Sequence, residues 1–340
     1  MADPPRFEHG LKAPQAPVIS RLHYGSNKPS EQYLLFNLDG LFFFYCDCII
    51  ISSCLRHNEI LRLTPDYVSR EKRFVVGVVG VGNMGSALVR GIINKGFVDK
   101  KSIIICDVDN KKVNILCKEL GVVDGINAER VANLSDLIIL ASKPQNITSL
   151  LEQISSETET SQTVMSIAAG ITTSSIEKYL PEIPVIRVMP NLPALIGEGM
   201  SIFCRGSYVD DIDVDRVKNV LDAIGICLES SEDLMDSVTA LSGTGPAYVF
   251  HTIEVMIESG IEMGMSKEMA EDLVLQTVFG SALLAIKSKL SPTELRKEVT
   301  SKGGTTDAAI THLANNNYTK IVIEAILAAK NRSKELGNSK

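Results

Sequence analysis

Histidines, paired cysteines and clusters of basic residues are scarce in this 340-residue chain, and each scarcity argues against a class of function. Only His251 and His312 follow residue 73, and neither has the H-x-x-H or H-E-x-x-H spacing of a metal enzyme. The seven cysteines are an odd number without a repeating spacing, so neither a disulfide framework nor a zinc pair is indicated. The sequence predicts free thiols, no metal site and a reducing compartment, for which we expect the cytoplasm.

Charge and hydropathy argue against two kinds of partner. The net charge is -7, and no block of Lys and Arg occurs, so a nucleic-acid partner is not expected. The apolar stretch 33–55 is cut by Asp39, Gly40 and Asp47, which does not suit a membrane-spanning helix, and it lies too far from the N-terminus for a signal peptide. We therefore expect no clear membrane association.

The length suggests two domains. Residues 1–72 begin with a Pro-punctuated polar stretch, and we interpret them as a poorly ordered extension, with a membrane or organelle role as the alternative. From Arg73 onward, apolar strands alternate with helical patterns, as in VVGVVG, IIICD, DLIILASKP, TVMSIAAG and PVIRVMP. The sequence thus predicts an α/β fold with a parallel-sheet, Rossmann-type domain over 73–230.

The C-terminal part, 231–340, has only helical patterns. S-P-T-E at 291–294 has the form of a capping box with Pro at the first helical position. The segment 273–286, LVLQTVFGSALLAI, is apolar or small on nearly every face, so it needs cover on every side. We expect an all-helical dimerisation domain in which a second subunit supplies that cover, giving a homodimer or a higher homo-oligomer.

The stretch GVGNMG at 80–85 matches G-x-G-x-x-G between a buried strand and a helix, which is the context of a dinucleotide-binding turn. Asp107 ends the next strand, where a carboxylate accepts hydrogen bonds from the ribose 2'-OH of NADH and repels the 2'-phosphate of NADPH. Lys111 and Lys112 start the following helix and are placed either to face a phosphate or to form a solvated helix face. NADPH and NADH both stay possible, and the sequence slightly favours NADH.

Three further stretches follow in order: RVMPNLPALIGEGM, ALSGTGPAYVF and VTSKGGTTDAAI. With ASKPQ and SIAAGIT they resemble the hallmark motifs of the pyrroline-5-carboxylate reductase family, over residues 73 to about 337. The resemblance implies an NAD(P)H-dependent oxidoreductase that acts on a C=N bond and reduces the small-molecule substrate 1-pyrroline-5-carboxylate to L-proline, in proline biosynthesis. Two departures are Lys302, where Pro is common, and Leu192, where Thr is usual.

The resemblance also implies site residues. The cofactor would contact Gly80, Val81, Gly82, Asn83, Met84, Gly85, Asp107, Asn127, Ser142, Lys143, Pro144, Ala168 and Ala169. The substrate would contact Glu232, Gly303, Gly304, Thr305 and Thr306, with Thr306 as the catalytic residue beside the imine nitrogen. The alternatives are structural: Glu232 as a first-turn carboxylate, Thr305 and Thr306 as caps of the next helix, and His251 as a structural residue.

Two other functions stay open at this point. A related imine or hydroxyacid reductase would have the same two domains, although the hydroxyacid type should carry a Lys within 246–263, where this chain has none. A non-catalytic dinucleotide sensor would keep the glycines and lose the Gly-Gly-Thr-Thr loop, which this chain retains.

Overall fold

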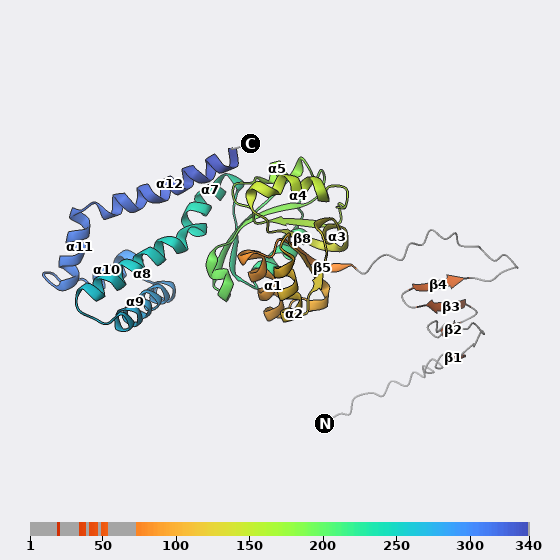
Figure 1. Ribbon diagram of the computed structural model, residues 1–340, viewed down its shortest axis with the longest axis horizontal. Coiled ribbons are helices and arrows are strands. Elements are labelled where there is room, and N and C mark those ends of the chain that lie inside the picture. Colours follow the sequence, from red (N-terminus) through yellow and green to blue (C-terminus); the bar gives the residue numbers. More distant parts are fainter. Residues whose placement is uncertain (1–18, 21–33, 39–40, 47–48, 54–72, 339–340) are drawn as a thin grey trace, which may run out of the picture. The chain divides into compact units, whose positions relative to one another are not determined.

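The computed structural model describes residues 19–20, 34–38, 41–46, 49–53 and 73–338 (Figure 1). The chain divides into two units, 1–69 and 70–340. In the first unit, four strands pair in sequence order as an antiparallel sheet: β1 Ile19–Ser20, β2 Leu34–Leu38, β3 Leu41–Cys46 and β4 Ile49–Ser53. The expected poor order of residues 1–72 falls mostly outside the described residues and stays a prediction.

The second unit contains an eight-stranded sheet in the order β12-β11-β10-β9-β8-β5-β6-β7. The first strand of this unit, β5 (Phe74–Val79), lies third from the β7 edge, and later strands are added on both sides of it, as in a Rossmann domain. The other strands are β6 Ile103–Cys106, β7 Val123–Asp124, β8 Ser135–Leu140, β9 Thr163–Ser166, β10 Val185–Met189, β11 Gly199–Arg205 and β12 Gly225–Glu229.

The sheet is not wholly parallel, which corrects the expectation from sequence. Strand β11 pairs antiparallel with β10, whereas β12 pairs parallel with β11. The cause is the connection: β10 and β11 are joined by the short 3-10 helix η3 (Leu192–Ile196), and a connection without a crossover helix reverses the chain direction. The six strands from β7 to β10 are parallel, so their carboxyl ends share one edge.

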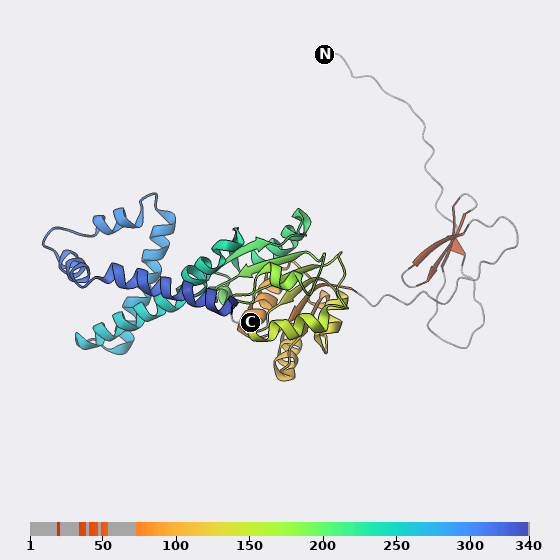
Figure 2. The ribbon, with the colours of Figure 1, turned by 90° about the horizontal axis from the view of Figure 1, so that it is seen from above.

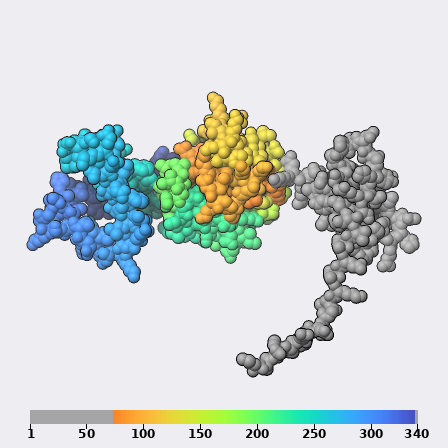
Figure 3. Space-filling model, turned by 90° about the horizontal axis from the view of Figure 1, so that it is seen from below, coloured from red at the N-terminus to blue at the C-terminus, as the bar shows by residue number. Residues whose placement is uncertain are grey.

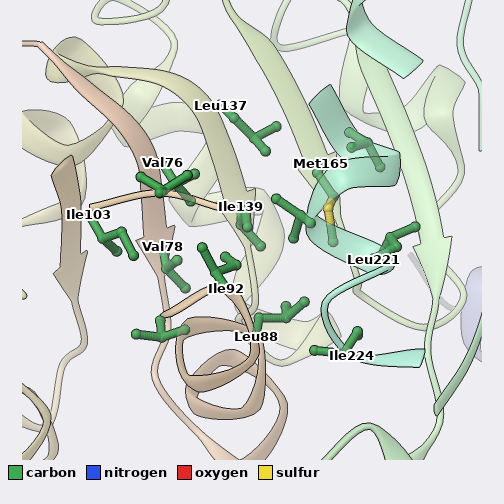
Figure 4. Packing of buried hydrophobic residues seen from close by; sticks show 14 of the residues in the cluster. Val76, Val78, Leu88, Ile92, Ile103, Leu137, Ile139, Met165, Leu221 and Ile224 are labelled. Atoms are coloured by element: carbon green, nitrogen blue, oxygen red, sulfur yellow. The ribbon is translucent and has the colours of Figure 1, made fainter. Parts of the chain in front are cut away.

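Helices cover both faces of this sheet, because alternate residues of the buried strands point to opposite sides. In β8, Leu137 and Ile139 pack with Leu88 and Ile92 of α1 (Figure 4). Ile138 lies in the cluster on the other face. The helices of the domain are α1 Asn83–Lys95, α2 Asn110–Leu120, α3 Ala128–Leu134, α4 Ile147–Ile154, α5 Thr173–Glu177 and α6 Asp211–Leu221, with short 3-10 turns η1 Lys100–Ser102 and η2 Pro144–Asn146.

All the elements after β12 are helical. They are η4 Glu232–Leu234, α7 Met235–Val238, the π-helical turn η5 Thr239–Gly243, α8 Gly245–Glu262, α9 Lys267–Lys287, α10 Pro292–Glu298, α11 Thr305–Asn315 and α12 Tyr318–Asn338. The predicted capping box is confirmed, because the Glu294 N–H donates to Ser291 Oγ at 3.3 Å and the Ser291 N–H to Glu294 Oε2 at 2.7 Å. In the π turn the Thr244 N–H donates to the Thr239 carbonyl, five residues back.

The helical part leaves much of its apolar surface exposed, and it forms an open lobe beside the Rossmann domain (Figure 3). In α9 the buried side chains are Ala270 and Val274, whereas Phe279 is 61% exposed. Among the described residues, α9 is the helix whose length and composition would suit a membrane span. A helix that is apolar on most sides requires cover, and the described part of this chain does not provide it.

Candidate cofactor and substrate site

The glycine-rich turn between β5 and α1 has two glycines fixed by packing and one that faces open space. Gly80 has φ +98°, and a Cβ there would lie 2.8 Å from the Ala141 carbonyl oxygen. A Cβ on Gly85 would clash with the Gly80 carbonyl oxygen. Gly82 is the N-cap of α1, and a Cβ there would meet nothing within 4 Å. The turn thus leaves room at a helix N-terminus for a pyrophosphate, so the residues present fit the expected dinucleotide.

Asp107 follows β6 and is hydrogen-bonded to this turn. Its Oδ2 accepts the Val81 N–H at 2.7 Å, and its Oδ1 accepts the Asp109 N–H at 2.9 Å. Each carboxylate oxygen can accept a second hydrogen bond, so a ribose hydroxyl still has acceptors there. Asp107 therefore holds the glycine-rich turn in place in addition to the ribose role expected from sequence.

Lys112, near the start of α2, forms an ion pair with Asp109. Its Nζ lies 3.8 Å from Asp109 Oδ2, and both side chains are about half exposed. This arrangement is typical of a solvated helix face, and the interpretation in which Lys111 or Lys112 faces a phosphate stays a prediction.

The other expected cofactor residues lie at the same edge of the sheet. Ser142, Lys143 and Pro144 follow β8, and the Ala141 N–H donates to the Val79 carbonyl at 2.8 Å, which places this loop beside the glycine-rich turn. Ala168, buried, and Ala169, partly buried, follow β9. Asn127 caps α3, accepting the Arg130 N–H at 2.9 Å. Parallel strands bring these loops together because their carboxyl ends share an edge.

Glu232 follows β12 in the chain but lies beside the loop after β9 and the start of α5. Its Oε1 accepts the Thr173 N–H at 2.8 Å, and its Oε2 accepts the Thr173 hydroxyl at 2.6 Å. Arg187, whose side chain is 5% exposed, donates to the same carboxylate at 3.2 Å. Glu232 thus joins the start of the helical part to the N-terminus of α5, which is a more specific contact than a first-turn carboxylate makes. An open pocket of 330 Å³ lies beside it.

The Gly303–Thr306 segment has a different structure from the simple cap expected as an alternative. The N-cap of α11 is Gly304, without a side-chain capping bond, so the interpretation of Thr305 or Thr306 as the cap is wrong. The Gly303 N–H donates to Asp307 Oδ2 at 2.8 Å, and the Gly304 N–H to the Ser301 carbonyl at 2.9 Å. The glycines therefore shape the loop, and the first-turn N–H groups at Thr305 and Thr306 lack partners within the helix.

This loop is distant from the cofactor loops of the same chain. In both ribbon views α10 and α11 lie at the end of the helical lobe farthest from β5 and α1 (Figures 1 and 2). The structure therefore brings Glu232 close to the loop after β9, which carries Ala168 and Ala169 of the expected cofactor residues. It does not bring Gly303, Gly304, Thr305 and Thr306 to the expected cofactor residues within one chain.

Two thiols near the site are unsuited to act as nucleophiles. Burial, with the Asp107 carboxylate as the next contribution, raises the pKa of Cys106 to about 12. Burial, with the charge of Glu232, raises the pKa of Cys204 to about 12. Both thiols stay protonated at neutral pH, because the thiolate is the charged form that burial disfavours.

Comparisons with known proteins agree with this geometry. Residues 75–170 match the family model "NADP oxidoreductase coenzyme F420-dependent", and residues 232–336 match "Pyrroline-5-carboxylate reductase dimerisation". A pyrroline-5-carboxylate reductase of Methanosarcina acetivorans is 37% identical over 263 residues, which are 77% of this chain and 97% of the relative. The chain belongs to the pyrroline-5-carboxylate reductase family. The Arabidopsis thaliana reductase is 33% identical, covering 78% of this chain and 96% of its own.

A solved structure of another member of the family supports the fold. The Plasmodium falciparum pyrroline carboxylate reductase, crystallised with NADP bound, superposes with a TM-score of 0.72 at 33% identity, covering 78% of this chain and 99% of its own. The family, the Rossmann domain with a helical dimerisation domain, and the class of NAD(P)-dependent oxidoreductase are confirmed. The preference for NADH over NADPH stays a prediction.

Several structural residues of the reductase site were not identified from sequence. Arg187 is a charged residue inside the buried strand β10, and this isolated charge was the signal that could have marked it. Asn191 accepts the Met200 N–H at 2.8 Å and lies 3.4 Å from Ser242 Oγ, so it connects the β10–β11 turn to the π turn. Unlike these two residues, His251 was named from sequence, as a structural residue; it is exposed and contacts Glu254 on the same helix at 3.3 Å.

The charge of Asp107 should determine nucleotide preference. Replacing it by Asn removes the charge and keeps one acceptor oxygen, so the ratio of kcat/KM for NADPH to that for NADH should rise by about 5 to 30-fold, equivalent to about 1 to 2 kcal/mol. Binding of both nucleotides should weaken somewhat, because the Val81 or Asp109 N–H loses an acceptor. Asp99→Asn, at the opposite end of β6, is the control and should leave the ratio unchanged. An unchanged ratio in Asp107→Asn would show that another group reads the ribose.

Proposed function

We propose that this protein reduces the ring C=N bond of 1-pyrroline-5-carboxylate to give L-proline, with NADPH or NADH as the hydride donor. Family membership over nearly the whole length of the relatives supports this, together with a glycine-rich turn whose central glycine faces open space. The same proposal places the reaction in proline biosynthesis and the protein in the cytoplasm.

NAD(P)H, when bound, supplies the hydride and the reducing electrons. The chain's own residues would position it: the Gly80–Gly85 turn at the pyrophosphate, Asp107 and Asn127 toward the adenosine, and the loops at Ser142–Pro144 and Ala168–Ala169 along the nicotinamide half. Buried parallel strands fix these loops, which lowers the entropic cost of aligning the donor. Glu232, at the same edge, would contact the substrate through acceptor capacity that remains after its bonds to Thr173 and Arg187.

The substrate side of the site would be completed by a second copy of the chain. The Gly303–Thr306 loop is remote from the chain's own nucleotide-binding turn, and the helical lobe exposes large apolar side chains such as Leu273, Phe279 and Leu284. Pairing two lobes would cover these side chains, and it would bring the loop of one copy to the nucleotide of the other. A homodimer is then the minimal active unit, and higher homo-oligomers are compatible with it.

In this loop the N–H groups of Thr305 and Thr306, at the positive end of α11, would bind the substrate carboxylate. The Thr306 hydroxyl would serve the ring nitrogen, which gains an amine's hydrogen-bonding needs as the carbon receives hydride. An interaction that strengthens along this path lowers the barrier. Thr306 is the candidate catalytic residue because its side chain is partly buried and makes no capping bond.

Thr306→Val should lower kcat/KM by about 10 to 100-fold, the loss expected for one transition-state hydrogen bond. Thr306→Ser keeps the hydroxyl and should recover most of the rate. Thr311→Val, an exposed position on the same helix, is the matched control and should leave the rate unchanged. Normal kinetics in Thr306→Val would assign the imine contact to another residue.

The function itself is tested by mixing the protein with NADPH or NADH and adding 1-pyrroline-5-carboxylate. We expect loss of the reduced-nicotinamide absorbance and formation of proline in equal amounts. Nucleotide binding without turnover would instead favour the sensor alternative, and turnover only with other imines or hydroxyacids would favour a related reductase.

A further inference from the structure

The end of α12 returns from the helical lobe and packs against the loop that follows β9. Gly170 in this loop has φ +75°, and a Cβ there would lie 3.2 Å from the Gly337 backbone nitrogen. A Cβ on Gly337 would lie 2.7 Å from the Gly170 carbonyl oxygen. The two backbones thus touch without a side chain between them, and neither glycine can gain a Cβ unless the helix or the loop moves.

A second contact holds this end of α12 in place. The Ser333 hydroxyl, in a residue that is 5% exposed, donates to Asp236 Oδ1 of α7 at 2.7 Å. Four residues before Asp236, Glu232 accepts both hydrogen bonds from Thr173 at the start of α5. The first and last turns of the helical part therefore meet at the loop 167–172, and the ribbon ends beside α5 (Figure 1).

The position of this loop matters because it contains Ala168 and Ala169, which the proposed function places along the nicotinamide. Gly170 directly follows them. The inner side of the loop is fixed by the Ile167 N–H, which donates to the Leu140 carbonyl at 3.1 Å. Its outer side is fixed by Gly337. If Gly170 moved, the adjacent residue Ala169 would move with it.

We propose that Gly337 is a positioning residue for nucleotide binding, and that the last turn of α12 sets the depth of the nicotinamide-side loop. This inference rests on the proposed placement of the cofactor. Gly337 touches neither substrate nor nucleotide, and it acts through Gly170.

Replacing Gly337 by Ala should affect helix stability and nucleotide affinity differently. This difference separates a positioning role from a role in general stability. Alanine favours a helix more than glycine does, which offsets part of the cost of the new contact, so Gly337→Ala should change the melting temperature of the protein only slightly. The same Cβ presses on the Gly170 carbonyl and should displace the loop. A residue with only a structural role would change stability and nucleotide affinity in the same direction.

The test is the dissociation constant of NADPH and of NADH, measured by fluorescence titration on the full-length protein, together with the melting temperature. Gly337→Val should raise the dissociation constant by about tenfold, and Gly337→Ala should raise it by a smaller factor while the protein stays folded. Ala328→Val places the same valine side chain at an exposed position of α12, and it should leave the dissociation constant unchanged.

Wild-type affinity in a folded Gly337→Ala or Gly337→Val protein would overturn the inference and leave the proposed function intact. If the wild-type protein bound neither nucleotide, the proposed function would fail first and the inference with it. The two failures are therefore distinguishable from the same set of titrations.

Discussion

Mixed dimers with Gly82→Asp in one chain and Thr306→Val in the other should recover about half of the wild-type activity, because one of their two sites combines the two intact parts. Gly82→Asp alone should be inactive. Its side chain would enter the open space at the N-terminus of α1, where its charge repels a pyrophosphate, while an Asp at the N-cap suits the helix. Thr306→Val alone should retain about 1 to 10% of wild-type kcat/KM.

The experiment requires coexpression of the two chains with different affinity tags, so that two successive purifications isolate the mixed pairs. If each site were built within one chain, the mixed pair would have one site without nucleotide and one with the Thr306→Val defect. Its activity would then be half that of the Thr306→Val protein, about 10 to 100-fold below the value expected for a shared site. That result would remove the second copy from the proposed site.

Phe279→Glu should dissociate the protein and abolish its activity together. Phe279 is 61% exposed on α9 in the single chain, and we expect the second lobe to cover it. Burying an unpaired carboxylate there would cost several kcal/mol, about the size of the favourable free energy that such a core contact contributes. Activity should fall even though every residue of the Rossmann domain is intact.

Sedimentation velocity and steady-state kinetics measure the two effects. Phe97→Glu is the matched control, because Phe97 is 42% exposed but lies next to the Gly96 cap of α1 in the Rossmann domain. It should stay associated and active. A Phe279→Glu protein that remained a fully active oligomer would place α9 outside the interface.

The Rossmann part of the fold could be predicted from sequence because its information is local. The apolar run of β5, the three glycines and the periodic apolar residues of α1 each determine the conformation of their own segment. The direction of β11 could not be predicted this way, since a short apolar run is the same whether its strand is parallel or antiparallel to its neighbour.

The site was predictable where one motif forms it and not where distant segments meet. Asp107 was placed beside the ribose, but its bond to Val81 joins residues 26 positions apart and has no local signature. The contact of Glu232 with Thr173 spans 59 positions. For Thr306 the difficulty is greater, because we expect its substrate-binding partners to belong to another chain.

The π turn at Thr239–Gly243 determines the direction in which the helical lobe faces. It lies between α7, which is bonded to the end of α12, and α8, which leads into the lobe. Since an α-helix turns about 100° per residue, the one extra residue in the wide turn rotates every later side chain of α8 by about that angle relative to an uninterrupted helix. The one extra residue in this turn thus determines which side of α8 faces a second copy of the chain.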